Sequence, residues 1–275
     1  MQISLSTKAS KKNEFAPKNI KDWSWINLGG NYYLEAKALR KHGFRHGFFT
    51  RQWSHKKPKE LSSYLFNHKT VHMLRQKHTG NVLYASQAKQ HPLPTADGLV
   101  SDMSKQSLWL YSADCIPIFF ADPESGLVAA CHAGWRGLTL RITSMTLRKL
   151  ISIGAKIETL IIVMGPAISV DNYEVNTEIY EAIAKTLGDK FEPLKKSENW
   201  VRYSDTKESF MGNNKTEKVL IDLRLAASEQ LIMEGVKASQ IIICPICTMK
   251  EKNFFHSWRR DQIKATQWSC IANNQ

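Results

Sequence analysis

The sequence has no long uninterrupted apolar run and no apolar core near its N-terminus. The first absence argues against a membrane-spanning helix, which needs about 20 apolar residues, and the second argues against a secretory signal peptide. The opening residues are instead polar and rich in lysine. We therefore expect a cytoplasmic protein without a membrane partner, and a partly ordered N-terminal extension over residues 1–43.

Acidic residues are few relative to basic ones, since 25 Asp and Glu stand against 38 Lys and Arg and give a net charge of +13. This charge fits a nucleic-acid partner, an anionic small substrate or a solvated basic surface. The sequence lacks a glycine-rich phosphate loop, an RNA-binding aromatic motif and the spacing of a C2H2 zinc finger. Its lysines are scattered along the chain, so we expect no nucleic-acid partner.

Cysteine is scarce, with five residues in a chain of 275. An odd count without a signal peptide favours a reducing compartment, in which thiols stay free or bind metal. Cys244 and Cys247 form a C-x-x-C pair, but no second pair completes a zinc site, and we interpret the pair as structural. Cys131 and Cys270 are expected in the core.

From residue 107 onward, strand-like and helix-like segments alternate. Two apolar runs flank a turn at residues 122–126 and predict buried strands. Apolar residues at helical spacing predict helices over residues 138–153, 177–187 and 219–234. The alternation indicates an α/β fold. No clear linker interrupts the chain, so we expect one domain over residues 44–275, with a charged surface excursion at 188–216.

The two runs around the turn carry polar residues that are costly to bury without a partner. Asp114 and Cys115 lie inside the first run, and His132 ends the second. A thiolate and an imidazole on adjacent strands suit zinc or copper. Equally, Cys115 fits a small core residue and His132 a histidine with its hydrogen bonds satisfied, and this stretch alone leaves both interpretations open.

Six motifs, taken in order, resemble one known family. They are QKHTGNV, SADCIPIFFAD, CHAGWRGL, MGPAISVDNYEV, a helix start at Asp222-Leu223-Arg224, and CTMKEKNFFHSWRRD. Over residues 44–272 the chain resembles the YfiH/laccase-domain family, also called the multicopper polyphenol oxidase or purine nucleoside phosphorylase family. The tail ATQWSCIA is similar to that of its cyanobacterial and plant members.

The chain departs from the family's pattern on the substrate side. It lacks the usual TGR ending, and it lacks the Gly-Gly-Val-Ser and Asn-Leu-Gly signature after Arg51. His256 precedes Ser257 and Trp258 where the family more often has FFSYRR. These departures concern the substrate range more than metal binding.

The resemblance implies a single-domain, layered α/β sandwich with mixed sheets and a metal site of two histidines and one cysteine. The ligands carried over to this sequence are His78, Cys115 and His132. Three protein ligands leave a fourth position open, as in catalytic zinc sites, although copper suits the same donors. Cys115 and Asp114 are implied as catalytic residues, and Asp114 or Glu174 as the proton shuttle.

The resemblance also implies a purine nucleoside enzyme whose partners are a purine nucleoside and phosphate. The family is credited with phosphorolysis of adenosine, inosine, guanosine and methylthioadenosine, and with adenosine deamination. Planar guanidinium groups bind phosphate through two hydrogen bonds at once. The candidates for this contact are Arg51, Arg136, Arg259 and Arg260.

Three other functions remain as alternatives. A laccase-like polyphenol oxidase would use copper, but one cysteine and two histidines make a single mononuclear site, and the His-x-His pairs of multicopper clusters are absent. A cysteine-dependent hydrolase acting on a peptidoglycan precursor would use Cys115 as nucleophile and a histidine as base. A basic binding module would need no chemistry at Cys115.

Overall fold

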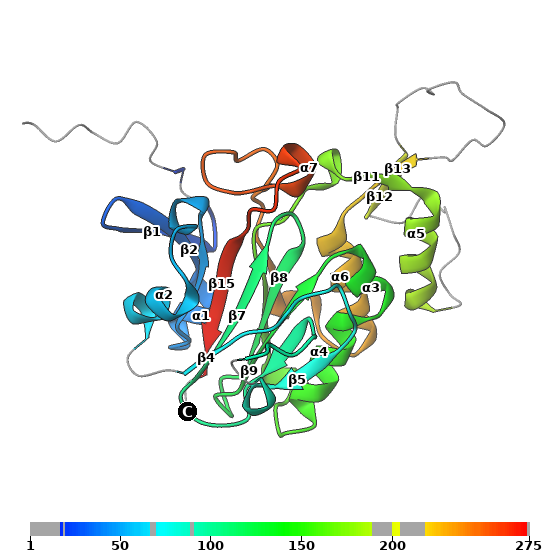
Figure 1. Cartoon of the computed structure of the whole chain (residues 1–275). Helices are drawn as coiled ribbons and strands as arrows, with labels where there is room; N and C mark the ends of the chain where they lie inside the picture. Colours follow the sequence, from blue (N-terminus) through cyan, green and yellow to red (C-terminus); the bar gives the residue numbers. More distant parts are fainter. Residues whose placement is uncertain are drawn as a thin grey trace, which may run out of the picture.

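The computed structural model describes residues 17–18, 20–66, 70–88, 91–188, 200–203 and 218–273. The first part of the predicted N-terminal extension and most of the predicted excursion at 188–216 lie outside these residues. The described chain is a layered α/β structure with mixed sheets, as predicted (Figure 1). None of its helices is long and apolar enough to cross a membrane.

The first sheet has six strands in the order β1-β2-β3-β15-β7-β4. Their bounds are β1 Trp23–Leu28, β2 Asn31–Ala36, β3 His46–Phe49, β15 Gln267–Ala272, β7 Gln106–Ser112 and β4 Thr70–His72. Only β4, parallel to β7, departs from antiparallel pairing among these described strands. Strands β1 and β2 lie within residues 1–43, and β2 pairs with β3. This part of the chain therefore extends the first sheet.

The second sheet has six strands in the order β14-β10-β8-β9-β6-β5 and is also mixed. Their bounds are β14 Ile241–Ile243, β10 Ile161–Met164, β8 Ile116–Ala121, β9 Val128–Ala133, β6 Gly98–Val100 and β5 Val82–Tyr84. A small third sheet contains β11 Glu174–Asn176, β13 Lys218–Ile221 and β12 Val201–Tyr203. The predicted strands around the turn at 122–126 are β8 and β9.

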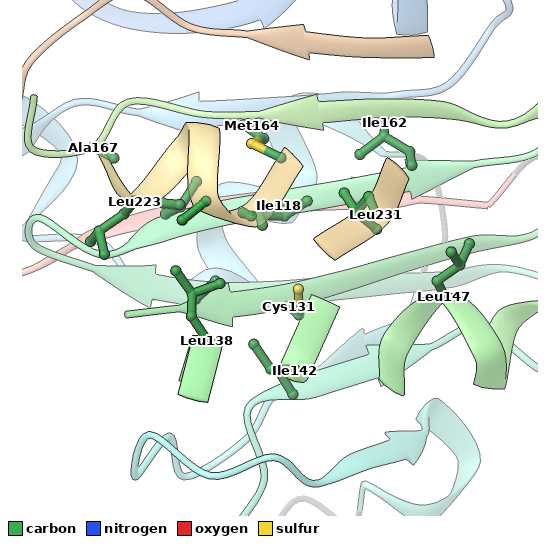
Figure 2. Packing of buried hydrophobic residues seen from close by; sticks show 14 of the residues in the cluster. Ile118, Cys131, Leu138, Ile142, Leu147, Ile162, Met164, Ala167, Leu223 and Leu231 are labelled. Carbon is green, nitrogen blue, oxygen red and sulfur yellow. The ribbon is translucent and has the colours of Figure 1, made fainter. Parts of the chain in front are cut away.

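Seven α-helices of the described residues surround the sheets, and α5 among them packs on the small third sheet (Figure 1). Their bounds are α1 Lys37–Lys41, α2 Pro58–Leu65, α3 Trp135–Thr139, α4 Ile142–Ile151, α5 Thr177–Ala184, α6 Leu223–Met233 and α7 Trp258–Asp261. Helix α2 packs on the first sheet, where Leu61 contacts the cluster that contains Trp109. Helices α4 and α6 pack on the second sheet through residues such as Leu147 and Leu231 (Figure 2).

Alternation along β8 and β9 divides their side chains between two cores. Ile118 and Cys131 face the helices, whereas Phe119 and Val128 face the first sheet. Cys131 is thus a core residue, as predicted, and Figure 2 shows it among the side chains of this cluster. His132 points to the opposite side from Cys131, at the end of β9.

Two helix predictions need correction. The sequence pattern predicts one helix over residues 138–153, but this stretch divides into α3 and α4 because Arg141 takes a left-handed φ of 56°. The expected helix at 219–234 starts as strand β13, and α6 begins only after Asp222. The Asp222 carboxylate accepts the N–H groups of Arg224 and Leu225, which caps α6 at this point.

Candidate metal centre

Three donor side chains from separate segments meet where β8 begins and β9 ends. His78 comes from the segment between β4 and β5, Cys115 directly precedes β8, and His132 lies in β9 opposite Pro117. The donor atoms of these three residues lie within 4.8 Å of one another. Cys115 Sγ is 3.8 Å from His78 Nε2. His132 is buried, Cys115 is partly buried and His78 is exposed, so the site opens to solvent beside His78.

The donor set fits a tetrahedral metal ion. Nitrogen and sulfur ligands at about 2.0 and about 2.3 Å from zinc stand about 3.6 Å apart, close to the separation of Cys115 and His78. Nδ1 of His132 is 3.0 Å from an Asp97 oxygen, which leaves Nε2 for a metal. Three such ligands leave one coordination position for water or substrate.

Asp97 is a residue of this site that the sequence did not single out. It directly precedes β6, is fully buried, and accepts hydrogen bonds from His132 and from the backbone and hydroxyl groups of Thr79. Burial alone raises the pKa of its carboxyl, but His132 and Thr79 more than offset this and lower it to about 2. The available signal was an acidic residue at the start of an apolar strand, a position with a high desolvation cost.

The two histidines stabilise a thiolate at Cys115. Burial raises the pKa of a thiol, but His132 and then His78 act in the opposite direction and bring the pKa of Cys115 to about 6. Burial likewise lowers the pKa of His132, and Cys115 and Asp97 raise it to about 9. A thiolate beside an imidazolium suits both a soft metal ligand and a nucleophile.

Gly134 provides the space that the three donors occupy. A Cβ atom built on Gly134 would lie 2.6 Å from Cys115 Sγ and 3.2 Å from His78 Cδ2. The backbone of Gly134 is extended, with φ at −93°, so every residue type could adopt its conformation. Glycine is needed here because of the room beside the thiol.

The Asp114 side chain is turned away from the histidines. Its carboxylate accepts hydrogen bonds from Thr248 Oγ1 at 2.6 Å, Ser257 Oγ at 3.0 Å and the Arg259 backbone N–H at 2.7 Å. Asp114 also has a φ of 88°, which turns the chain directly before Cys115. The buried carboxylate thus joins the Cys115 segment to the start of α7, and the residue that orients a ligand histidine is Asp97.

Two of the four predicted phosphate-binding arginines lie over aromatic rings near the site. The Arg259 guanidinium lies 4.9 Å from the centre of the Tyr173 ring, and the Arg136 guanidinium lies 4.1 Å from that of Trp135. Burial and, to a smaller extent, the charge of Cys115 raise the pKa of Tyr173 above its ordinary value. Arg259 and Arg136 act in the opposite direction but do not offset this rise. Tyr173, which the sequence did not single out, lies under the guanidinium group of Arg259.

The guanidinium groups of Arg260 and Arg51 donate hydrogen bonds to backbone carbonyl groups. Arg260 donates to the carbonyl groups of Thr248, Met249 and Phe255 and pairs with Asp261. Arg51 donates to the Lys252 carbonyl. These contacts hold the segment that leads into α7.

Glu174 presents its backbone to the site. Its carbonyl accepts from Arg259 Nη1 at 2.9 Å, and its carboxylate pairs with Lys218 at 3.2 Å. The carboxylate of Glu174, implied above as a possible proton shuttle, is thus directed to Lys218 at the start of β13.

The sequence pattern of one family covers most of the chain. The family described as "Multi-copper polyphenol oxidoreductase laccase" matches residues 55–273. The chain belongs to this family. Within it, the chain is 31% identical over 258 residues to a purine nucleoside phosphorylase of Synechocystis, with 91% of this chain and 97% of the relative covered. It is 32% identical to a purine nucleoside phosphorylase of Bacteroides thetaiotaomicron, with 76% and 71% covered.

Another relative carries a different activity in its name. The chain is 32% identical over 168 residues to "Adenosine deaminase RL5" of an unknown prokaryotic organism, with 61% of this chain and 58% of the relative covered. The relatives of this family member are thus named for two reactions of purine nucleosides.

Solved structures share the fold. YlmD from Geobacillus stearothermophilus matches with a TM-score of 0.74 and 24% identity, over 91% of this chain and 99% of that chain. The YfiH protein of Bacillus licheniformis matches with a TM-score of 0.73 and 23% identity, over 90% and 98%. The layered α/β fold predicted from the sequence is therefore the fold of the YfiH-like proteins.

Proposed function

We propose that the chain is a metal-dependent purine nucleoside enzyme that catalyses phosphorolysis of adenosine, inosine, guanosine and methylthioadenosine, and deamination of adenosine. The observation that carries this proposal is the convergence of His78, Cys115 and His132 around an opening beside His78. The names of the relatives support the substrate class. Zinc is the proposed ion, and copper suits the same donors.

The residues around the ligands divide the work of the reaction. A bound zinc ion would supply a water molecule of lowered pKa at the open position. Asp97 orients His132, and the aromatic ring of Tyr173 lies under the guanidinium group of Arg259. Arg259 and Arg136, each of which lies over an aromatic ring, are the proposed phosphate contacts because planar guanidinium groups bind phosphate through two hydrogen bonds at once.

A cysteine-dependent hydrolase is the second candidate, and one observation favours it. Cys115, His132 and Asp97 form a thiolate, imidazole and carboxylate in series, with the pKa of Cys115 near 6. In such a mechanism the thiolate attacks an acyl carbon, His132 protonates the leaving group, and water releases the product. His78 has no required part in this mechanism, and His132 is the base.

The cysteines support a cytoplasmic location as part of the proposal. All five lie within the described residues, and all five are free thiols. Free thiols are typical of a reducing compartment.

Paired histidine variants test the metal mechanism. We expect His78→Ala and His132→Ala each to lose bound zinc and more than about 100-fold of adenosine turnover. Loss of a residue that hydrogen-bonds a ligand already costs about 10- to 100-fold in affinity or activity, and loss of the ligand itself should cost more. Metal content is measured by mass spectrometry. Turnover is followed as adenine and ribose 1-phosphate with phosphate present, and as inosine without it.

The exposed histidine His55 provides the matched control, because His55→Ala should retain both zinc and turnover. Chelation should abolish wild-type turnover, and added zinc should restore it. Near-normal turnover in His78→Ala, together with inactivation by a thiol alkylator but not by a chelator, would replace the metal mechanism with the thiolate mechanism.

A further inference from the structure

One buried carboxylate contacts the segments of both histidines through separate oxygens. Asp97 Oδ1 lies 3.0 Å from His132 Nδ1. Asp97 Oδ2 accepts from the Thr79 backbone N–H at 2.6 Å, the Thr79 hydroxyl at 2.9 Å and the Lys77 backbone N–H at 3.2 Å. Thr79 and Lys77 flank His78, whose φ of 58° lies in the left-handed region that few residues other than glycine adopt.

We propose that Asp97 is a positioning residue that fixes the tautomer of His132 with one oxygen and the place of His78 with the other. A carboxylate only accepts hydrogen bonds, so the proton lies on Nδ1 of His132, and Nε2 keeps its lone pair for the metal. The inference rests on the metal centre of the proposed function, and it is independent of the substrate.

Asparagine at this position distinguishes the two oxygens. An amide has one acceptor oxygen, and three donors from Lys77 and Thr79 compete for it at the Oδ2 position. The amide nitrogen then faces His132 Nδ1 and donates to it, which moves the imidazole proton to Nε2. His132 loses its ligand lone pair in Asp97→Asn, although the side chain has nearly the same shape.

The test compares Asp97→Asn with Asp97→Ala. Alanine removes the acceptor of the Thr79 and Lys77 N–H groups, so Asp97→Ala should unfold at lower urea than Asp97→Asn. Zinc affinity should not follow this order. We expect Asp97→Asn to bind zinc roughly 10- to 100-fold more weakly than wild type, and at least as weakly as Asp97→Ala. Affinity is measured by competition with a chromogenic chelator.

Asp122 supplies a matched control at the opposite end of β8. It is also fully buried and accepts hydrogen bonds from Glu124, Ser125 and Thr159. Asp122→Asn should lower the stability to unfolding, because it also replaces a buried, hydrogen-bonded carboxylate. Its zinc affinity should stay within about threefold of wild type.

The proton position is read directly from wild type. Long-range 15N–1H spectra of the zinc-loaded protein should show a protonated Nδ1 and a metal-bound Nε2 at His132. A proton on Nε2 would overturn the proposal even if no variant folds. It is equally overturned if Asp97→Asn binds zinc as wild type does, or if both asparagine variants lose zinc affinity equally. Neither readout uses a nucleoside, so a different substrate would leave the result unchanged.

Discussion

At the scale of single residues, the space beside the Cys115 thiol is as important as the donors themselves. Gly134→Ala would place a methyl group 2.6 Å from Cys115 Sγ, while the extended backbone accepts alanine without strain. We expect Gly134→Ala to lose more than about tenfold in zinc affinity, because the ligands must shift. In the zinc-free state, Gly134→Ala should lose less stability to urea than a variant in which alanine replaces a glycine of positive φ.

Gly154 is the matched control for this prediction. It has a φ of 110° with no atom within 4 Å of a built Cβ, so alanine is strained there but meets no neighbour. Gly154→Ala should cost about 1 kcal/mol of stability and leave zinc affinity unchanged. If Gly134→Ala and Gly154→Ala lose stability and zinc affinity to the same extent, Gly134 does not serve to provide space for the thiol.

At the scale of elements, Asp114 connects the start of β8 to the start of α7. Asparagine can replace it with little loss, because the hydroxyl groups of Thr248 and Ser257 can rotate to accept from an amide, and asparagine tolerates a positive φ. We expect Asp114→Asn to retain turnover within about tenfold, and Asp114→Ala to be destabilised by about 1–3 kcal/mol.

Urea unfolding and adenosine turnover of the two variants together separate the roles of Asp114. If Asp114→Asn is stable but inactive, the carboxylate is a proton shuttle. If turnover follows stability in both variants, its hydrogen bonds to α7 are the part that matters.

The sequence predicted individual strands and helices better than it predicted the contacts between distant segments. Two apolar runs on either side of a turn identified β8 and β9, and motifs that resemble those of a known family identified the three donors, because both are local patterns. The break at Arg141 was missed because a left-handed residue inside a helical pattern has no periodic signal. Asp97 was missed because its partners, Thr79 and His132, come from other segments. Tyr173 was missed for the same reason, because only the fold brings it close to Arg259.

At the scale of the whole molecule, a buried histidine sets the sensitivity of the fold to acid. His46 lies in β3, where Nε2 accepts the Ala36 N–H at 2.8 Å and Nδ1 donates to the Phe44 carbonyl at 2.9 Å. Burial, with a smaller effect of Arg40, lowers its pKa to about 4. An unfolded histidine has a pKa of about 6.5, so between these values only the unfolded chain takes up this proton.

The native state should therefore lose stability as the pH falls from about 6.5 to about 4, by up to about 3 kcal/mol from this group. Urea unfolding across this window measures the slope. In His46→Gln the protein should be less stable at neutral pH, but the His46 part of the slope should disappear. An unchanged slope in that variant would mean that other groups cause the acid sensitivity.

The position of β15 in the first sheet has a consequence for biosynthesis. β15 separates β3 from β7 and pairs with both, although more than half of the chain lies between β7 and β15 in the sequence. A ribosome must therefore translate the codons up to about residue 272 before the two parts of this sheet can join. Until then the nascent chain carries two unpaired strand edges, which make a stalled or prematurely terminated product prone to aggregation.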